Sequence, residues 1–158
     1  MVEVDGLTVS VWLHTNVDPP MPEWDEAIAT IQSYMAEHAT PLERLRGLVV
    51  SDGGAPNARQ RKALQSDVHK DRRSKAVVLT PVLSNPLKRG IATAIQWVNP
   101  DFHFHQPHEV AAAMTWIDLP GRFDALYAAL LVLQQRLPTV NALAMAAATA
   151  GLPPPPAR

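Results

Sequence analysis

Cysteine is absent from the 158-residue chain. Without cysteine the protein has no disulfide, no thiolate nucleophile and no Cys-ligated zinc or iron–sulfur centre. Charged residues are scarce, at 18% of the chain, against about 25% in a typical soluble protein. The 14 basic and 15 acidic residues leave a net charge of −1. The chain therefore lacks the basic face with which generic nucleic-acid binders neutralise phosphates.

Two features of exported or membrane-spanning chains are also missing. The first residues, Met1–Asp5, do not have the basic and apolar regions of a signal peptide, so we expect a cytoplasmic protein. No charged side chain occurs from Leu137 to Ala157. However, Pro138 and Pro153 leave only about 14 residues between them, whereas a bilayer needs about 20, so we expect no membrane span.

Hydrophobic residues make up 47% of the sequence, enough for one sizeable core. The pattern at the start predicts a β-hairpin. Val2 and Val4 precede Asp5-Gly6, a dipeptide suited to a type I′ turn because both of its central residues need φ > 0. From residue 7 to residue 14, apolar and other side chains alternate, which predicts a half-buried strand.

Helices and strands alternate after the hairpin. The pattern predicts, in order, a helix over about 22–38, a strand over 45–51, a mostly solvent-facing helix over about 56–69, a strand over 75–80, a helix over about 86–98, a strand over 101–106 and a helix from 107 to about 118. This order predicts an α/β sandwich with a mostly parallel sheet and one antiparallel strand at an edge.

Residues 120–158 follow a different pattern. Pro120-Gly121 interrupts the chain before a helix over about 122–137 and a short Ala-rich helix within 139–150. Seven large apolar residues share one face of the first of these helices: Phe123, Leu126, Tyr127, Leu130, Leu131, Leu133 and Leu137. Such a face is costly to expose, so it packs on the body or pairs with a second copy in a homodimer, and the sequence leaves both open. We divide the chain into an α/β domain (1–119), a helical extension (120–152) and an extended Pro-rich tail (153–158).

The segments Gly53–Arg61 and Arg89–Pro100, set in this order of elements, suggest a family. Residues 1–119 resemble the STAS domain of anti-sigma-factor antagonists and small bacterial STAS-like proteins. The resemblance implies a STAS-like sandwich that acts by binding another protein. In that family a Ser or Thr at the start of the second helix is phosphorylated by a partner kinase. The matching loop here reads Ala55-Pro56-Asn57, with no hydroxyl at that point.

The loop Ser51–Arg59 is the candidate ligand-binding or switch loop. Ligands of open α/β sheets sit beyond the carboxyl ends of strands, and glycine backbones followed by a helix start can receive an anion. The candidate residues are Ser51, Asp52, Gly53, Gly54, Asn57 and Arg59. Neither a G-x-G-x-x-G nor a P-loop spacing is present. The alternative is therefore a tight turn in which Asp52 or Asn57 satisfies backbone N–H groups.

Three histidines form a second candidate site. His103 and His105 share one face of a strand, and His108 follows three residues later, a spacing that can bind zinc or nickel. No further ligand is clearly placed to complete a closed site. We expect instead a solvated histidine face, with Phe102 and Phe104 turned inward, and no metal.

A hydrolase would need a nucleophile, a base and an orienting group, for which Ser51, His14 and Asp52 offer the atoms. No nucleophile elbow of the G-x-S-x-G type is present. We therefore expect no catalytic site and no cofactor.

Basic residues gather on the second predicted helix and at its exit: Arg59, Arg61, Lys62, Lys70, Arg72, Arg73 and Lys75. This segment has no aromatic residue for stacking on bases, so it forms either a solvated helix face or a docking surface for an acidic protein. We interpret the chain as a non-enzymatic regulatory interaction module. Its partner-binding residues would be Arg59, Arg61, Lys62, Phe123, Leu126, Tyr127, Leu130 and Leu133. The alternative is a small-ligand or nucleotide-binding domain that uses the loop Ser51–Arg59.

Overall fold

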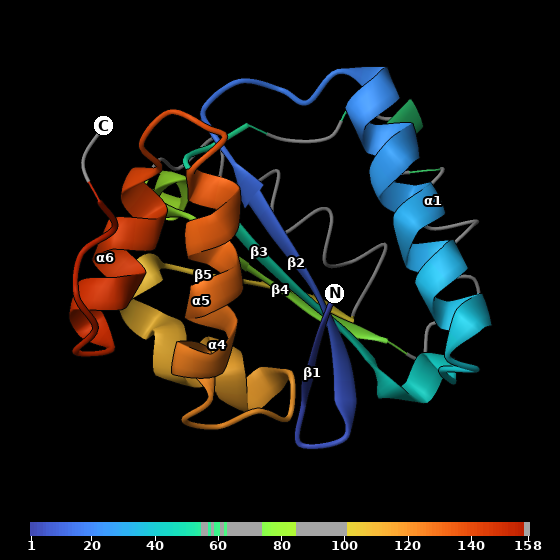
Figure 1. The fold of residues 1–158 in the computed structure, drawn as a ribbon. Helices are drawn as coiled ribbons and strands as arrows, with labels where there is room; N and C mark the ends of the chain where they lie inside the picture. The colour runs from blue at the N-terminus through green and yellow to red at the C-terminus, as the bar shows by residue number, and fades with distance from the viewer. Residues whose placement is uncertain (55–56, 58, 61, 63–73, 85–100, 157–158) are drawn as a thin grey trace.

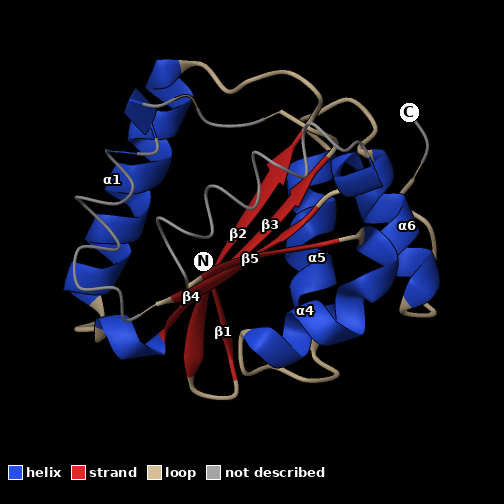
Figure 2. Cartoon of the chain, turned by 180° about the vertical axis from the view of Figure 1, so that it is seen from behind, coloured by secondary structure: helices blue, strands red, loops and turns tan. Residues whose placement is uncertain are grey.

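A computed structural model describes residues 1–54, 57, 59, 60, 62, 74–84 and 101–156. The strands are β1 (Val2–Val4), β2 (Leu7–His14), β3 (Leu45–Ser51), β4 (Lys75–Leu79) and β5 (Phe102–His105). The helices are α1 (Met21–Glu37), α4 (Val110–Trp116), α5 (Phe123–Gln134) and α6 (Asn141–Thr149). The sheet lies between α1 on one face and α4, α5 and α6 on the other (Figure 1; Figure 2 gives the view from behind). The fold is α/β, as the sequence predicts.

The hairpin forms as predicted. β1 pairs antiparallel with β2, and Val4 lies opposite Leu7. Asp5 has φ 50° and Gly6 has φ 80°, the two positive values that a type I′ turn requires. Strands β2 to β5 are parallel to one another. The antiparallel strand is therefore at an edge of the sheet.

The strand order is β1-β2-β3-β4-β5, so the described strands follow the order of the sequence without a reversal. Open α/β sheets bind ligands where the strand order reverses. The described sheet has no such switch point, so the strand order does not mark a ligand site at its carboxyl edge.

Two predicted helices fall largely beyond the described residues. Arg59, Gln60 and Lys62 are helical, and the rest of the helix expected over 56–69 lies outside the described residues. The helix expected over 86–98 lies outside them entirely. Among the described residues, no helix has the length and apolar character needed to span a membrane.

Strand β2 is buried on both faces, which corrects the half-buried strand expected from its alternation. Val9 belongs to the larger core, while Thr8 and Ser10 on the opposite face are only 3% and 7% exposed. The Ser10 hydroxyl donates to the carbonyl of Arg46 at 3.2 Å, and the Thr8 hydroxyl donates to the carboxylate of Glu3. Polar side chains can be buried when their hydrogen bonds are made. The alternation of apolar and polar residues along β2 therefore does not correspond to an alternation of buried and exposed side chains.

The larger core fills the space between the sheet and the layer of α4, α5 and α6. Nine of its buried residues come from 120–152: Phe123, Leu126, Tyr127, Leu130, Val140, Ala142, Leu143, Ala146 and Ala147. The extension thus packs on the body of its own chain, the first of the two arrangements that the sequence left open. A smaller core joins α1 to the other face through Trp24, Ile28, Ile31 and Leu45.

The apolar residues of α5 considered for partner binding are used inside the chain. Phe123, Leu126, Tyr127 and Leu130 are at most 5% exposed. Leu133 is partly buried against the same core. The solvent-facing side of α5 includes Val132, which is 55% exposed.

Candidate functional site

The loop after β3 is held by its own polar groups. The Ser51 hydroxyl is buried, donates to the carbonyl of Gly54 at 2.9 Å and accepts from the backbone N–H of Gly53 at 3.1 Å. The N–H of Gly54 donates to the carbonyl of Thr15 at 2.9 Å. A Cβ on Gly54 would lie 2.2 Å from the carbonyl oxygen of Val17, so only glycine fits there. The loop is therefore packed tightly on the segment that follows β2.

The side chain of Asp52 caps the start of α6. Its carboxylate accepts from the backbone N–H groups of Asn141 at 2.8 Å and Ala142 at 2.7 Å, and from the Asn141 side-chain amide at 3.1 Å. The N-cap residue of α6 is Val140, whose side chain makes no capping bond. Asp52 thus satisfies orphan donors and places a negative charge at the positive end of the helix. These bonds agree with the tight-turn interpretation in that Asp52 satisfies backbone N–H groups. The groups belong to α6, which is far from the loop in the sequence.

Asn57 and Gln60 form a reciprocal cap at the start of the second helix. The N–H of Gln60 donates to the Asn57 side chain at 3.0 Å, and the N–H of Asn57 donates to the Gln60 side chain at 2.7 Å. The side-chain amide of Gln60 also donates to the carbonyl of Pro19 at 2.7 Å, and the backbone carbonyl of Gln60 accepts from the Trp24 indole at 3.0 Å. Asn-x-x-Gln is a capping-box spacing, a signal that was present in the sequence and not used. Asn57 therefore caps the second helix, and Gln60 ties that helix to α1.

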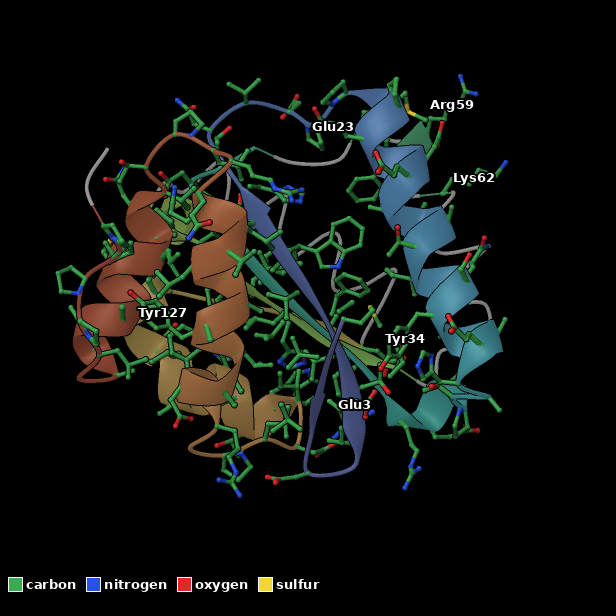
Figure 3. The ribbon with its side chains drawn as sticks, in the orientation of Figure 1. Glu3, Glu23, Tyr34, Arg59, Lys62 and Tyr127 are labelled. Carbon is green, nitrogen blue, oxygen red and sulfur yellow. The ribbon has the colours of Figure 1, made fainter. Side chains whose placement is uncertain are left out.

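Arg59 and Lys62 are exposed, as Asn57 is, but they carry a positive charge. Both extend away from the body at the end of the molecule where α1 begins, near Glu23 (Figure 3). Arg61, the third basic residue of the predicted docking surface, lies outside the described residues. Arg59 and Lys62 are thus two exposed basic side chains at the start of the second helix.

The hydrolase trio does not form a chain of nucleophile, base and orienting group. His14 lies opposite Ser51 in the β2–β3 register, but the Ser51 hydroxyl donates to Gly54 and the Asp52 carboxylate is used by α6. Among the described residues, His14 Nδ1 has no hydrogen-bond partner. The His14 ring lies 6.1 Å from the ring of Trp12. Burial lowers the pKa of His14, and a hydrogen bond with the backbone of Gly54 opposes this shift.

The histidines of β5 pack beneath α4, which corrects the solvated histidine face expected from the sequence. His103 lies opposite Val77 and His105 opposite Leu79, both of which belong to the larger core. The ring of His103 stacks on Trp116 of α4, with 3.4 Å between centroids. Because α4 covers this face, the alternation along β5 places Phe102 and Phe104 on the opposite face.

No metal centre is found around these histidines in the described part of the chain. No cluster of three or more His, Asp or Glu side chains there could hold an ion. His105 Nδ1 lies 3.8 Å from the Glu109 carboxylate. The pKa of His103 is lowered by burial and by the charge of His105. His103 is therefore a packing ring in an aromatic stack with Trp116.

Asp118 is the centre of an ion-pair network that the sequence analysis missed. It has φ 62° just beyond α4, and its carboxylate lies 2.7 Å from both Arg46 and Lys75. Arg46 is 8% exposed and also donates to the carbonyl of Ile117 at 3.2 Å. The Lys75 ammonium, followed by the Arg46 guanidinium, lowers the pKa of Asp118. The network joins β3, β4 and the end of α4, so its role is structural.

Comparison with known proteins assigns no function: no family model matches the chain, and no curated protein or solved structure is significantly similar to it. A fold class does not imply a function, because the same architecture hosts many activities.

Proposed function

We propose that the protein is a cytoplasmic, non-enzymatic interaction module of STAS-like architecture with a regulatory role. Its docking surface is the start of the second helix, with Arg59, Arg61 and Lys62. The observation that carries the proposal is that polar residues of the segment 52–62 differ in their contacts. Asp52 and Asn57 cap helices of this chain, whereas the exposed, charged side chains of Arg59 and Lys62 make no hydrogen bond within the described residues. The antiparallel hairpin followed by parallel strands in sequence order is compatible with the family resemblance.

Charge around the docking surface favours an acidic partner in one orientation. The indole of Trp24 donates to the carbonyl of Gln60, so the first turns of α1 adjoin the second helix. Glu23, Asp25 and Glu26 are exposed on these turns. An acidic protein segment is attracted by the basic pair and repelled by α1, which fixes its register on the surface.

The alternative, a nucleotide or small-ligand site at the loop Ser51–Arg59, has less support. A ligand would need free backbone N–H groups, but those of Gly53 and Gly54 already donate to Ser51 and Thr15. The Asp52 carboxylate would repel a phosphate. Turning the Asp52 carboxylate away from a phosphate would break its hydrogen bonds to the start of α6.

The test is capture of a partner from an extract of the source cells by the tagged full chain. We expect wild type to retain an acidic protein that the R59E/K62E variant loses. The matched control is R44E/R136E, which reverses two exposed arginines elsewhere on the chain. Equal retention by R59E/K62E and wild type would contradict the proposal, as would a rise in melting temperature with a nucleotide at millimolar concentration.

A further inference from the structure

The chain leaves α6 along a fixed path. Gly151 has φ 71°, its N–H donates to the carbonyl of Ala148 at 3.2 Å, and the N–H of Leu152 donates to the carbonyl of Ala147 at 2.9 Å. This pair of bonds is the Schellman motif, which satisfies carbonyls at the helix end. Leu152 then packs against the larger core. The direction of the chain is therefore set before the prolines begin.

Tyr127 fixes the first proline. Its side chain is 5% exposed, and its hydroxyl donates to the carbonyl of Pro153 at 2.6 Å. We call Pro153–Pro156 the proline arm. Pro153, Pro154 and Pro156 are exposed, and among the described residues no hydrogen bond reaches the carbonyls of Pro154–Pro156. The base of the arm is thus anchored by α5, and the remainder presents free acceptors (Figure 3 labels Tyr127).

Covalent geometry restricts the proline arm to one extended form. Each proline ring fixes φ near about −65°, and each residue before a proline is driven from the helical region toward polyproline II. With three residues per turn, Pro153 and Pro156 fall on the same edge of that helix. This is the P-x-x-P spacing that grooves lined by aromatic side chains recognise.

We infer that the proline arm is a second docking element, which binds a small protein domain of the SH3 type. Such a domain has an aromatic-lined groove for the prolines. Arg158 follows Pro156 by two residues and is the only charged residue after Arg136. It therefore favours a groove with an acidic rim. Because the arm is pre-extended and held by Tyr127, binding costs little additional ordering.

This inference concerns a different site from the proposed function. In Figure 1 the described chain leaves α6 on the other side of the sheet from α1, whereas Figure 3 shows Arg59 and Lys62 beside α1. The R59E/K62E variant should therefore bind a proline-recognising domain as wild type does. Loss of one activity without the other separates the two proposals.

The experiment is titration of the full chain into a panel of purified SH3 and WW domains by calorimetry. We expect binding to SH3 domains with an acidic rim, weakened at least 10-fold by P154A/P156A. The control P20A/P120A, which replaces two exposed prolines elsewhere, should bind within twofold of wild type. Circular dichroism establishes that each variant is folded.

A second variant tests the anchor. Tyr127→Phe keeps the proline sequence and removes the hydrogen bond to Pro153, so we expect an affinity about 3- to 5-fold lower. Absence of binding to every domain at 1 mM would overturn the inference. So would equal affinities of wild type and P154A/P156A, whereas binding to WW domains alone would overturn the assignment to the SH3 type.

Discussion

The carboxylate of Asp52 accepts a 2.7 Å hydrogen bond from the backbone N–H of Ala142, which is 90 residues further along the chain. This contact joins the carboxyl end of β3 to the first turn of α6. It shows that the acidic residue of a loop with the composition of an anion site is used to cap a helix of the same chain. It also makes the loop and the C-terminal helices depend on one another for stability.

Loss of the Asp52 cap should destabilise the protein. We expect Asp52→Ala to lower the free energy of unfolding by about 1–2 kcal/mol, because α6 loses a charged N-terminal acceptor. Asp52→Asn should cost less, since an amide oxygen also caps a helix. Urea denaturation measures both, with Glu37→Ala, an exposed change at the end of α1, as the control. A D52A protein as stable as wild type would show that the cap contributes nothing.

The Asp118 network should make stability depend on acid pH. The pKa of Asp118 is lowered by Lys75 and Arg46. Its contribution is therefore fully present above about pH 4, the unfolded value, and is lost as pH falls through the lowered folded value. We expect Asp118→Asn to cost about 1–3 kcal/mol at pH 7 because Arg46 stays buried without its carboxylate.

Urea midpoints measured between pH 2 and pH 7 test this sign. The difference between wild type and D118N should be constant above about pH 5 and shrink below about pH 4. The control is Asp5→Asn, because Asp5 pairs with Arg122 at 2.7 Å on the surface, with both side chains more than half exposed. Exposed pairs contribute about 0–1 kcal/mol. A D118N difference that persists unchanged to pH 2 would refute the assignment.

The helical extension should be essential to the larger core. We expect Leu126→Ala to cost about 2–5 kcal/mol, because Leu126 has no exposed surface in the structure. Val132→Ala on the same helix should change stability by less than about 0.5 kcal/mol, since Val132 is 55% exposed. A chain cut after Leu119 should fail to fold. Thermal unfolding of the three proteins measures this, and a truncated chain with the wild-type melting temperature would contradict it.

His14 should titrate below the ordinary histidine range. Burial lowers its pKa, and its ring lies 6.3 Å from Trp24. The unfolded chain therefore takes up this proton first, and stability should fall as pH drops from about 6.5, the unfolded value. NMR titration of the imidazole carbons gives the midpoint directly. A midpoint at or above that of an unperturbed histidine would contradict the burial.

The sequence predicted the elements whose signals are local. Asp5-Gly6 specified the hairpin turn, and the apolar spacing of Phe123, Leu126 and Leu130 specified α5, because turn chemistry and helical periodicity need only neighbouring residues. The burial of β3 between two parallel neighbours followed from the continuous apolar run Leu48-Val49-Val50. These signals were sufficient for the fold class.

The roles of individual polar residues could not be predicted in the same way. Asp52 caps α6, and Asp118 pairs with Arg46 72 residues away, contacts that exist only once the layers have packed. The orientation of β5 was missed for a related reason. Its four residues alternate Phe and His, and both types can be buried, so the strand itself does not say which face α4 covers.

The most direct test of the central claim is titration of the captured partner into purified wild type and R59E/K62E at low and high salt. The account predicts at least 10-fold weaker binding to the variant, and a smaller difference at high salt because exposed charges are screened. Equal affinities at low salt would contradict the claim that Arg59 and Lys62 form the docking surface.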